Sequence, residues 1–475
     1  MLLPMLSSIA FADMSSDYET AVRVARAETQ ERRRAELQEQ ELKTGLEPSA
    51  EAGLQFETEL ELRSDRLNNI ALGRRPGDNQ RETEEELTLG LSYRPNDRFL
   101  AFAEIKLVAD QLVFADDTPR ISEEAVERGE TWLFVKNAFD TGFSVQIGRQ
   151  NFFEPRLWWW DEDLDALRVY RASGAWNMYL GIAEELARTS THQDFIDPER
   201  QDVRRLLGYI NWGRLAQFNL SGFLLFQRDN SGSPPVDSTI EAVRADESDA
   251  DLAWAGLRAA GNIGMSRSGA LGYRLDVAVV TGDETLVEFE DVAPGLIRAN
   301  ATQQHSVHGW AVDAGASWVL PLRGEPTLNL IYAYGSGDGN INDDDDRSFR
   351  QTGLQDKDEE FRDYGVVLRP ELSNLRIATL ALRFAALPGD TRLTFGYHRF
   401  QQVYATPFLR ETDIDIQPVG INKDIGKETS LVLQLRKWED LEIDLVAGRF
   451  TAGKAYGAES GERATRLFFK LIYDF

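Results

Sequence analysis

The sequence has no cysteine, only four histidines and no long uninterrupted apolar run. Without cysteine there are no disulfides and no thiolate metal sites, which is compatible with an exported bacterial protein. Because no apolar segment is long enough for a transmembrane helix, the chain would have to cross a membrane with strands. The formal net charge of −27 argues against nucleic acid as a partner, since phosphates need a basic surface.

Catalysis is not expected from this composition. A hydrolase built on a barrel needs a histidine beside a serine near the lipid face. The histidine that falls within a strand pattern, His398, alternates with Phe395 and Tyr397 and is therefore expected on the lumen side. No glycine-rich phosphate loop or metal-ligand cluster stands out, so we expect no enzyme and no cofactor.

The N-terminal stretch differs from the rest of the chain. Residues 1–12 form an apolar run that ends at Ala10-Phe11-Ala12, as in the cleavage region of a signal peptide. The usual basic residues before such a run are missing, so we expect this signal peptide to be truncated and the true start to lie upstream. Residues 13–50 are rich in Glu, Arg, Gln and Ala, which favours a charged, helical periplasmic segment. The alternative is a docking helix for a periplasmic partner.

A pattern with a period of two begins near residue 51 and continues to residue 475. In the segment Leu60-Glu61-Leu62-Arg63, apolar residues lie on one face of a strand and charged residues on the other. About eighteen such segments of roughly ten residues follow one another, a number within the range of outer-membrane barrels. The last segment ends in the aromatic residue Phe475 and is expected to close the sheet on the first strand.

The lengths of the connections alternate between short and long. Short turns are predicted at residues 95–98, 137–141, 172–174, 213–214, 321–325, 387–390 and 438–440. Long polar loops are predicted at residues 65–79, 187–201, 230–248, 284–305, 339–373 and 404–424. This alternation indicates an all-β fold, a transmembrane antiparallel up-and-down β-barrel of about 18 strands with short periplasmic turns and long extracellular loops.

One loop stands out for its chemistry. The stretch from Gly148 to Asp163, GRQNFFEPRLWWWDED, combines arginines, acids and three consecutive tryptophans. Aromatic rings beside charged groups are typical of the membrane interface, so we expect Trp158, Trp159 and Trp160 at the mouth of the barrel.

These residues and three further stretches resemble the alginate export family of outer-membrane porins. The further stretches are Glu360–Gly365, Pro370–Leu375 and Asp424–Glu428, the last of them followed by Gly448-Arg449-Phe450. The resemblance covers the chain from about Gly53 to Phe475. It implies an eighteen-stranded barrel in the bacterial outer membrane with an arginine-rich constriction that passes an anionic uronate polymer.

Cationic side chains are the candidates for lining such a pore, because guanidinium pairs with carboxylate through two parallel hydrogen bonds. Strand alternation places one set on the lumen side: Lys106, Arg168, Arg274, Arg383, Arg436 and Lys470. The resemblance adds a second set: Arg149, Arg156, Asp161, Arg171, Arg362 and Arg449. Strict alternation would carry Arg149 and Arg449 to the lipid face, but each follows a glycine, where a bulge could turn it inward. For any one arginine, a structural pair with a neighbouring acid is the alternative role.

Acidic residues are also expected in the lumen, which would therefore be mixed in charge. Most of the excess negative charge lies in the loops, where divalent cations could bridge it to lipid headgroups. A weak candidate for structural Ca²⁺ is the run Asp343, Asp344, Asp345 and Asp346, which lacks the spaced glycine and terminal glutamate of a known calcium loop.

Two functions fit these features. The first is an anion-selective channel that secretes an anionic exopolysaccharide, alginate or a similar polyuronate. The second is a diffusion porin for small anionic solutes or oligosaccharides. The expected partners are outer-membrane lipid and lipopolysaccharide, the anionic saccharide itself and periplasmic proteins of a secretion complex. A purely structural, plugged barrel is a more distant third reading.

Overall fold

The structure is a computed structural model that describes twelve stretches of the chain. These are residues 53–74, 79–114, 121–154, 156–174, 176–215, 218–266, 269–322, 324–340, 343–355, 364–387, 391–438 and 440–475. The predicted signal peptide, the predicted periplasmic segment at residues 13–50 and the candidate Arg362 lie outside them. None of the helices in the described stretches is long and apolar enough to cross a membrane.

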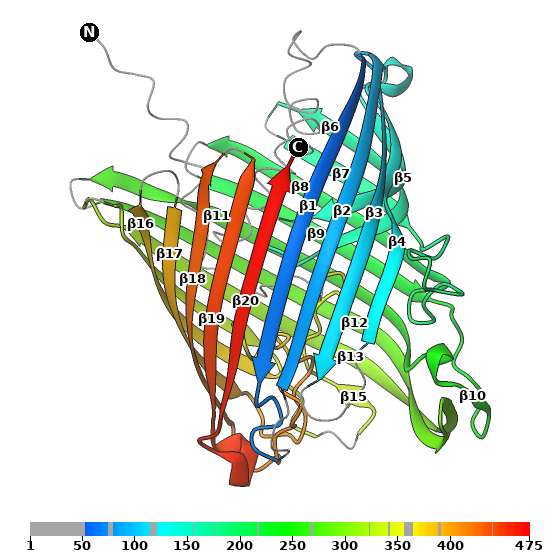
Figure 1. The fold of residues 1–475 in the computed structure, drawn as a ribbon, viewed down its shortest axis with the longest axis vertical. Helices are drawn as coiled ribbons and strands as arrows, with labels where there is room; N and C mark the ends of the chain where they lie inside the picture. The colour runs from blue at the N-terminus through cyan, green and yellow to red at the C-terminus, as the bar shows by residue number, and fades with distance from the viewer. Residues whose placement is uncertain are drawn as a thin grey trace.

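One closed antiparallel sheet forms the wall of a barrel, as Figure 1 shows. Within the described stretches, eighteen strands build it: β1 (Gly53–Asn68), β2 (Asn79–Asn96), β3 (Phe99–Phe114), β4 (Ile121–Val135), β5 (Ser144–Phe153), β6 (Asp161–Ser173), β7 (Trp176–Ala183), β8 (Val203–Leu215), β9 (Phe218–Asp229), β11 (Ser248–Ser266), β12 (Gly269–Ala293), β13 (Leu296–Val319), β14 (Thr327–Gly335), β16 (Leu375–Leu387), β17 (Thr391–Gln402), β18 (Asp424–Trp438), β19 (Leu441–Ala452) and β20 (Arg463–Asp474). The prediction of an up-and-down barrel of about eighteen strands is confirmed.

Short elements lie in the connections between wall strands. They are β10 (Thr239–Glu241), β15 (Asp345–Asp346) and the 3-10 helices η1 (Ala138–Asp140), η2 (Ala242–Arg244) and η3 (Lys454–Glu459). Strand β10 pairs with the far end of β13, and β15 pairs with β13 in parallel.

The two ends of the barrel differ. One end, here called the turn end, carries the short connections and the C-terminus, at the top of Figure 1. The other, here called the loop end, carries η3, β10 and β15 at the bottom of the same view. One predicted loop, residues 284–305, is instead strand: β12 and β13 continue as a hairpin with only residues 294–295 between them. Continued cross-strand pairing from Glu284 onward satisfies the backbone groups there without a loop.

The two faces of the wall follow the alternation of the sequence. Apolar side chains such as Ile147 and Leu180 are about half exposed, as expected for a surface that meets lipid. Their strand neighbours Gln146 and Tyr179 point the other way, into the barrel. Because every backbone group of a central strand pairs with a neighbour, the closed sheet can lie in hydrocarbon without unsatisfied edges.

Charge pairs join the first and last strands. Strand β20 pairs with β1 from Glu59 opposite Asp474 to Asn68 opposite Thr465, so the predicted closure is confirmed. Inside the barrel, the Arg466 Nε donates to Asp65 Oδ1 at 3.0 Å, and Lys470 Nζ lies 2.5 Å from Glu61 Oε1.

We expect Arg466→Met to destabilise the barrel by about 3–5 kcal/mol, because the Asp65 carboxylate would lose its guanidinium partner while remaining buried. Reversible unfolding by urea in lipid vesicles measures this difference. The control is Arg171→Met, which alters an exposed arginine on the outer face and should change stability by no more than about 0.5 kcal/mol. A decrease of less than about 1 kcal/mol in the free energy of unfolding of Arg466→Met would show that the buried Asp65 carboxylate does not depend on Arg466.

Candidate functional site

The connection between β5 and β6 folds into the barrel instead of projecting from it. Trp158, Trp159 and Trp160 are only 3%, 2% and 0% exposed. Trp159 stacks on Phe223 of β9 with ring centroids 4.8 Å apart. Its indole also covers Gly256 of β11, where a Cβ would overlap the ring. The prediction that these tryptophans lie at the mouth of the barrel, at the membrane interface, is therefore wrong: burying the aromatic rings against other side chains inside the barrel is more favourable than leaving them at the interface.

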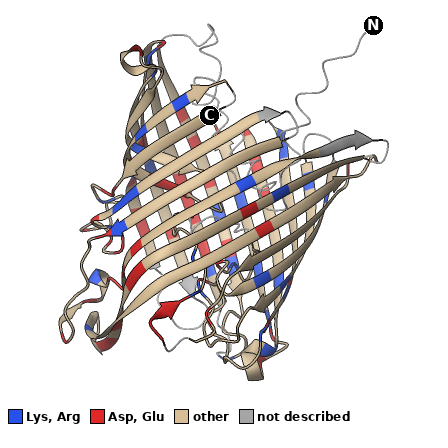
Figure 2. Ribbon diagram, turned by 180° about the vertical axis from the view of Figure 1, so that it is seen from behind, with Lys and Arg blue, Asp and Glu red and all other residues tan. Residues whose placement is uncertain are grey.

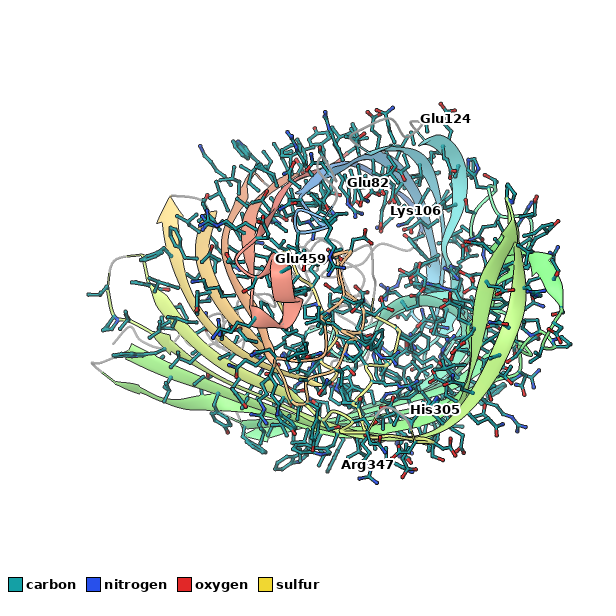
Figure 3. All side chains as sticks on the ribbon, turned by 90° about the horizontal axis from the view of Figure 1, so that it is seen from below. Glu82, Lys106, Glu124, His305, Arg347 and Glu459 are labelled. Atoms are coloured by element: carbon teal, nitrogen blue, oxygen red, sulfur yellow. The ribbon has the colours of Figure 1, made fainter. Side chains whose placement is uncertain are left out.

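Other loops fill the interior beside these tryptophans. Trp158 stacks on Phe349 with centroids 6.0 Å apart, and Phe349 belongs to the connection between β14 and β16. Buried residues of the connections between β17 and β18 and between β19 and β20, such as Ile414 and Tyr456, belong to the same apolar cluster. Figure 3, viewed from the loop end, shows these loops inside the ring of strands.

An ionic cluster anchors the β5–β6 connection to the wall. This central ionic cluster consists of three arginines and three acids: Arg156, Arg258, Arg274, Glu154, Asp276 and Asp313. Its formal charges cancel. Four of the six residues lie on neighbouring strands β11, β12 and β13, and two lie on the connection.

The acids of the wall create the need for the arginines. Asp276 of β12 and Asp313 of β13 stand directly opposite each other, and both are 0% exposed. Two carboxylates in that position repel, so positive partners are required. Arg156 supplies one by bridging them, with Nη1 donating to Asp276 at 2.5 Å and Nη2 donating to Asp313 at 3.2 Å.

Two wall arginines complete the compensation. Arg258 of β11 donates from Nε to Asp276 at 2.5 Å and pairs with Glu154 through Nη1. Arg274 of β12 donates from Nη2 to Asp313 at 2.7 Å. The alternation prediction for Arg274 is borne out by this lumen position. Arg258 and Glu154 were not predicted as site residues, although Arg258 follows the lipid-facing Leu257 and so could have been found by the same alternation.

A second carboxylate holds another loop inside the barrel. Glu428 of β18 is fully buried and accepts three backbone N–H groups, from Val366 at 2.6 Å, Val367 at 3.2 Å and Leu368 at 3.0 Å. Arg466 donates to the carbonyl oxygen of Val366 at 3.2 Å. The connection that enters β16 is therefore fixed to both β18 and β20.

The remaining predicted cations of the lumen are mostly paired with acids. Lys106 Nζ lies 3.2 Å from Glu86 Oε1, and Arg436 lies 3.0 Å from Glu442 and 2.9 Å from Asp444. Arg383 stands between Thr327 and Thr394, both of which are buried, so it shares the lumen face. These pairs make the interior mixed in charge, and Figure 2 shows Lys and Arg as well as Asp and Glu on the strands of the wall.

Arg168 differs from these cations because aromatic rings surround it. Its guanidinium lies 3.5 Å from the centroid of Phe152, and it donates to the Asn151 carbonyl at 2.7 Å and to the Tyr170 hydroxyl at 3.0 Å. Asp161, the acid of the predicted set, lies at the start of β6, where its backbone N–H donates to the Leu354 carbonyl at 2.6 Å.

Two predicted pore arginines face outward. Arg449 stands opposite Thr429 and Thr465 with no register shift after Gly448, so the bulge expected there is absent and the side chain is exposed. Arg171 stands opposite Met178, which is 36% exposed on the outer face. Strict alternation therefore overrides the family resemblance at both positions.

Arg149 also keeps the register of its strand. It lies on the same outer face as the lipid-facing Ile147, two positions away. It is nevertheless buried, because the connection after β7 covers it and places Glu185 Oε1 3.3 Å from Arg149 Nη1. Burial raises the pKa of Glu185 despite the opposing charge of Arg149. Arg149 therefore holds this loop against the outer face. The bulge that was expected to turn it toward the lumen does not occur, because the register of β5 continues unchanged past Gly148.

The acidic run of the loop end is engaged in local contacts. Asp343 accepts from Asn340 Nδ2 at 2.7 Å, and Asp346 lies 2.7 Å from Arg350. In the stretches that the structure describes, no group of three or more His, Cys, Asp or Glu side chains could hold a metal ion. Structural Ca²⁺ at this run stays an untested prediction.

The closed wall, its lipid-facing band and its long inward-folded loops define an outer-membrane β-barrel of the channel-forming class. The alginate export family model matches residues 51–470, so the chain belongs to the alginate export family. Its location in the bacterial outer membrane follows, as the sequence predicted. It is thus an outer-membrane channel protein of that family.

The chain is similar to known outer-membrane proteins, but its sequence identity to them is low. The alginate production protein AlgE of Azotobacter vinelandii is 23% identical over 349 residues, which are 67% of this chain and 70% of AlgE. Among solved structures, OccK5 (OpdH) of Pseudomonas aeruginosa has a TM-score of 0.53 at 10% identity and covers 89% of this chain and 98% of its own. OpdL of Pseudomonas aeruginosa has a TM-score of 0.52 at 10% identity, with 90% and 99% covered. At such identity the two structures show a shared fold alone.

We expect Arg156→Met to raise single-channel conductance in a planar bilayer and to make the current noisier. The β5–β6 connection would lose its bridge to Asp276 and Asp313, whose remaining repulsion would favour a looser interior. The control Arg171→Met removes an outer-face arginine and should conduct as the unaltered protein does. Equal conductance and equal noise for Arg156→Met would contradict a locking role.

Measurements at acid pH test the same anchoring of the β5–β6 connection, this time through Glu154. Burial raises the pKa of Glu154, but the Arg258 and Arg156 guanidinium groups outweigh burial and hold the pKa below its ordinary value of 4.5. A depressed pKa in the folded state means that the ionised carboxylate stabilises the inward loop above pH 4.5 and loses this effect only as the pH falls below that value.

Tryptophan fluorescence should therefore stay constant from about pH 8 to about pH 5 and shift to the red only below about pH 4.5. Glu154→Gln should show part of the red shift already at neutral pH. A transition in the unaltered protein centred above about pH 5 would show that Glu154 is not held in this way.

Proposed function

We propose that the protein is a secretion channel for an anionic exopolysaccharide, alginate or a similar polyuronate. Its family and the alginate production protein to which it is related support this class of cargo. The observation that carries the proposal is the central ionic cluster, which holds three guanidinium groups inside the barrel.

Exchange of carboxylates is the chemistry that this cluster can perform. A uronate carboxylate accepts the same parallel hydrogen bonds from guanidinium as an aspartate does. A polymer that enters the barrel would therefore compete with Asp276, Asp313 and Glu154 for their arginines. Each exchange leaves a buried carboxylate of the cluster without its partner, and this cost offsets much of the free energy gained from the new ion pair, so the polymer is held weakly and can move on.

Charge on the opposite wall directs the polymer toward this cluster. Acidic side chains including Glu82 and Glu86 share the inner face of β2 with Glu84, which lies 3.8 Å from Arg63. In Figure 3, Glu82 and Lys106 point into the barrel from this side. A polyanion would be repelled by that acidic face and attracted by the guanidinium groups of the central ionic cluster.

The alternative is a diffusion porin for small anionic solutes or oligosaccharides. The inward-folded loops support it, because Trp158, Trp159 and their neighbours narrow the interior. The two functions differ in cargo length: a porin would pass short oligouronates and would not be entered by a long chain.

Planar-bilayer recording with polyuronate added to one side tests the proposal. We expect the polyuronate to block the current, an uncharged polysaccharide of equal length to leave it unchanged, and Arg274→Gln to weaken the block roughly tenfold, since one guanidinium contact is lost. Block by short oligouronates alone would favour the porin. A current indifferent to every uronate would overturn both readings.

A further inference from the structure

Exposed cations gather on the outer face of the barrel near the loop end. Register and exposure place six of them there, and together they are called the basic belt: Arg66, Arg81, Arg376, Lys427, Arg449 and Arg463. They lie on β1, β2, β16, β18, β19 and β20. Figure 1 shows these strands in one continuous part of the wall, with β17 among them.

Each belt cation stands beyond an apolar band on its own strand. On β19 the outward residues run from Leu445, which is 41% exposed, through Ala447 to Arg449. On β20 they run from Leu467, 55% exposed, through Thr465 to Arg463. The cations therefore lie just past the hydrocarbon-facing band, at the depth of lipid headgroups on the loop side.

The belt places like charges side by side. Arg66 and Arg81 are directly opposite each other across β1 and β2, and both are exposed. Like charges in this position repel unless an anion lies between them. Within the described stretches, the hydrogen bond that the Arg66 side chain makes is from Nε to the amide oxygen of Asn68, at 3.1 Å.

The inside and the outside of the barrel treat cations differently. In the central ionic cluster every arginine has a carboxylate partner, whereas within the described stretches no belt cation has a carboxylate in ion-pair range. The outward acids near the belt do not cancel its positive charge. Asp424 is paired with Arg399 at 2.8 Å, and Glu85 lies four residues farther than Arg81 along β2, toward the turn end. On the other side of the barrel, β11 and β12 expose Asp251 and Asp283 instead.

We propose that the basic belt binds the phosphate groups of lipopolysaccharide, the phosphorylated glycolipid of the outer leaflet. Guanidinium binds phosphate through paired hydrogen bonds, and the apolar band on the turn-end side of the belt meets the acyl chains of the same molecule. An anion between Arg66 and Arg81 removes their repulsion. Lipopolysaccharide thus attaches to one side of the barrel, from β16 to β2, and this attachment does not depend on the cargo of the lumen.

The test compares phosphorylated lipid A with dephosphorylated lipid A as ligands of the folded, full-length protein, with bound lipid counted by native mass spectrometry. We expect Lys427→Gln, Arg449→Gln and Arg463→Gln combined to weaken binding of phosphorylated lipid A roughly a hundredfold, since three surface cations are removed. Dephosphorylated lipid A should bind as weakly to the unaltered protein. The matched control Arg171→Gln removes an outer-face arginine at the turn end and should leave binding unchanged.

Heat-dependent mobility in gels shows whether each variant has a folded barrel. Should the triple variant fail to fold, the pair Arg66→Gln and Arg81→Gln takes its place, with an expected loss of roughly tenfold. Unchanged binding in a folded variant, or equal binding of the dephosphorylated lipid, overturns the proposal. Equal affinity for phosphatidylglycerol also overturns it, because the belt would then be a general anionic-lipid surface.

Discussion

Two facing carboxylates, Asp276 and Asp313, set the constraint on which the interior depends. They lie opposite each other on β12 and β13 with no exposure to solvent, where the repulsion between them and the cost of desolvation are both large. Three guanidinium groups contact them, and the third acid of the cluster, Glu154, makes the charges cancel. One of the three, Arg156, comes from a loop and bridges both aspartates, so this bridge forms only when that loop is inside the barrel.

The filled interior follows from this anchoring. Once Arg156 is in place, Trp158, Trp159 and Trp160 enter with it, and the loop that contains Phe349 packs on them. The Glu428 carboxylate fixes the segment from Val366 to Leu368 in the same way, through backbone N–H groups. A channel that holds its loops by carboxylate contacts is one in which a polyanionic cargo can compete for the same donors.

Position relative to water decides how a cation is used in this barrel. Inside, an unpaired charge is costly, so Arg258, Arg274 and Lys470 each have an acid beside them. Outside, at headgroup depth, an exposed cation such as Arg449 is free to meet a lipid phosphate. The same residue type thus serves loop anchoring on one face and membrane contact on the other.

The sequence by itself determined the barrel, because a period of two and alternating loop lengths are local properties of the chain. It also determined the lumen side for Lys106, Arg274 and Lys470, since strand alternation assigns a face without knowledge of neighbours. The expected inward turn of Arg449 was wrong because it relied on a bulge, and a bulge depends on the partner strand.

Only the tertiary structure decided where the loops go and which charges meet. The sequence predicted Trp158 to Trp160 at the membrane interface. Their burial instead depends on Phe223, Gly256 and Phe349, which are distant in the sequence. The pairing of Arg156 with Asp276 and Asp313 spans more than a hundred residues. Alternation tells which face a side chain takes, but contacts across the lumen depend on the closure of the whole sheet.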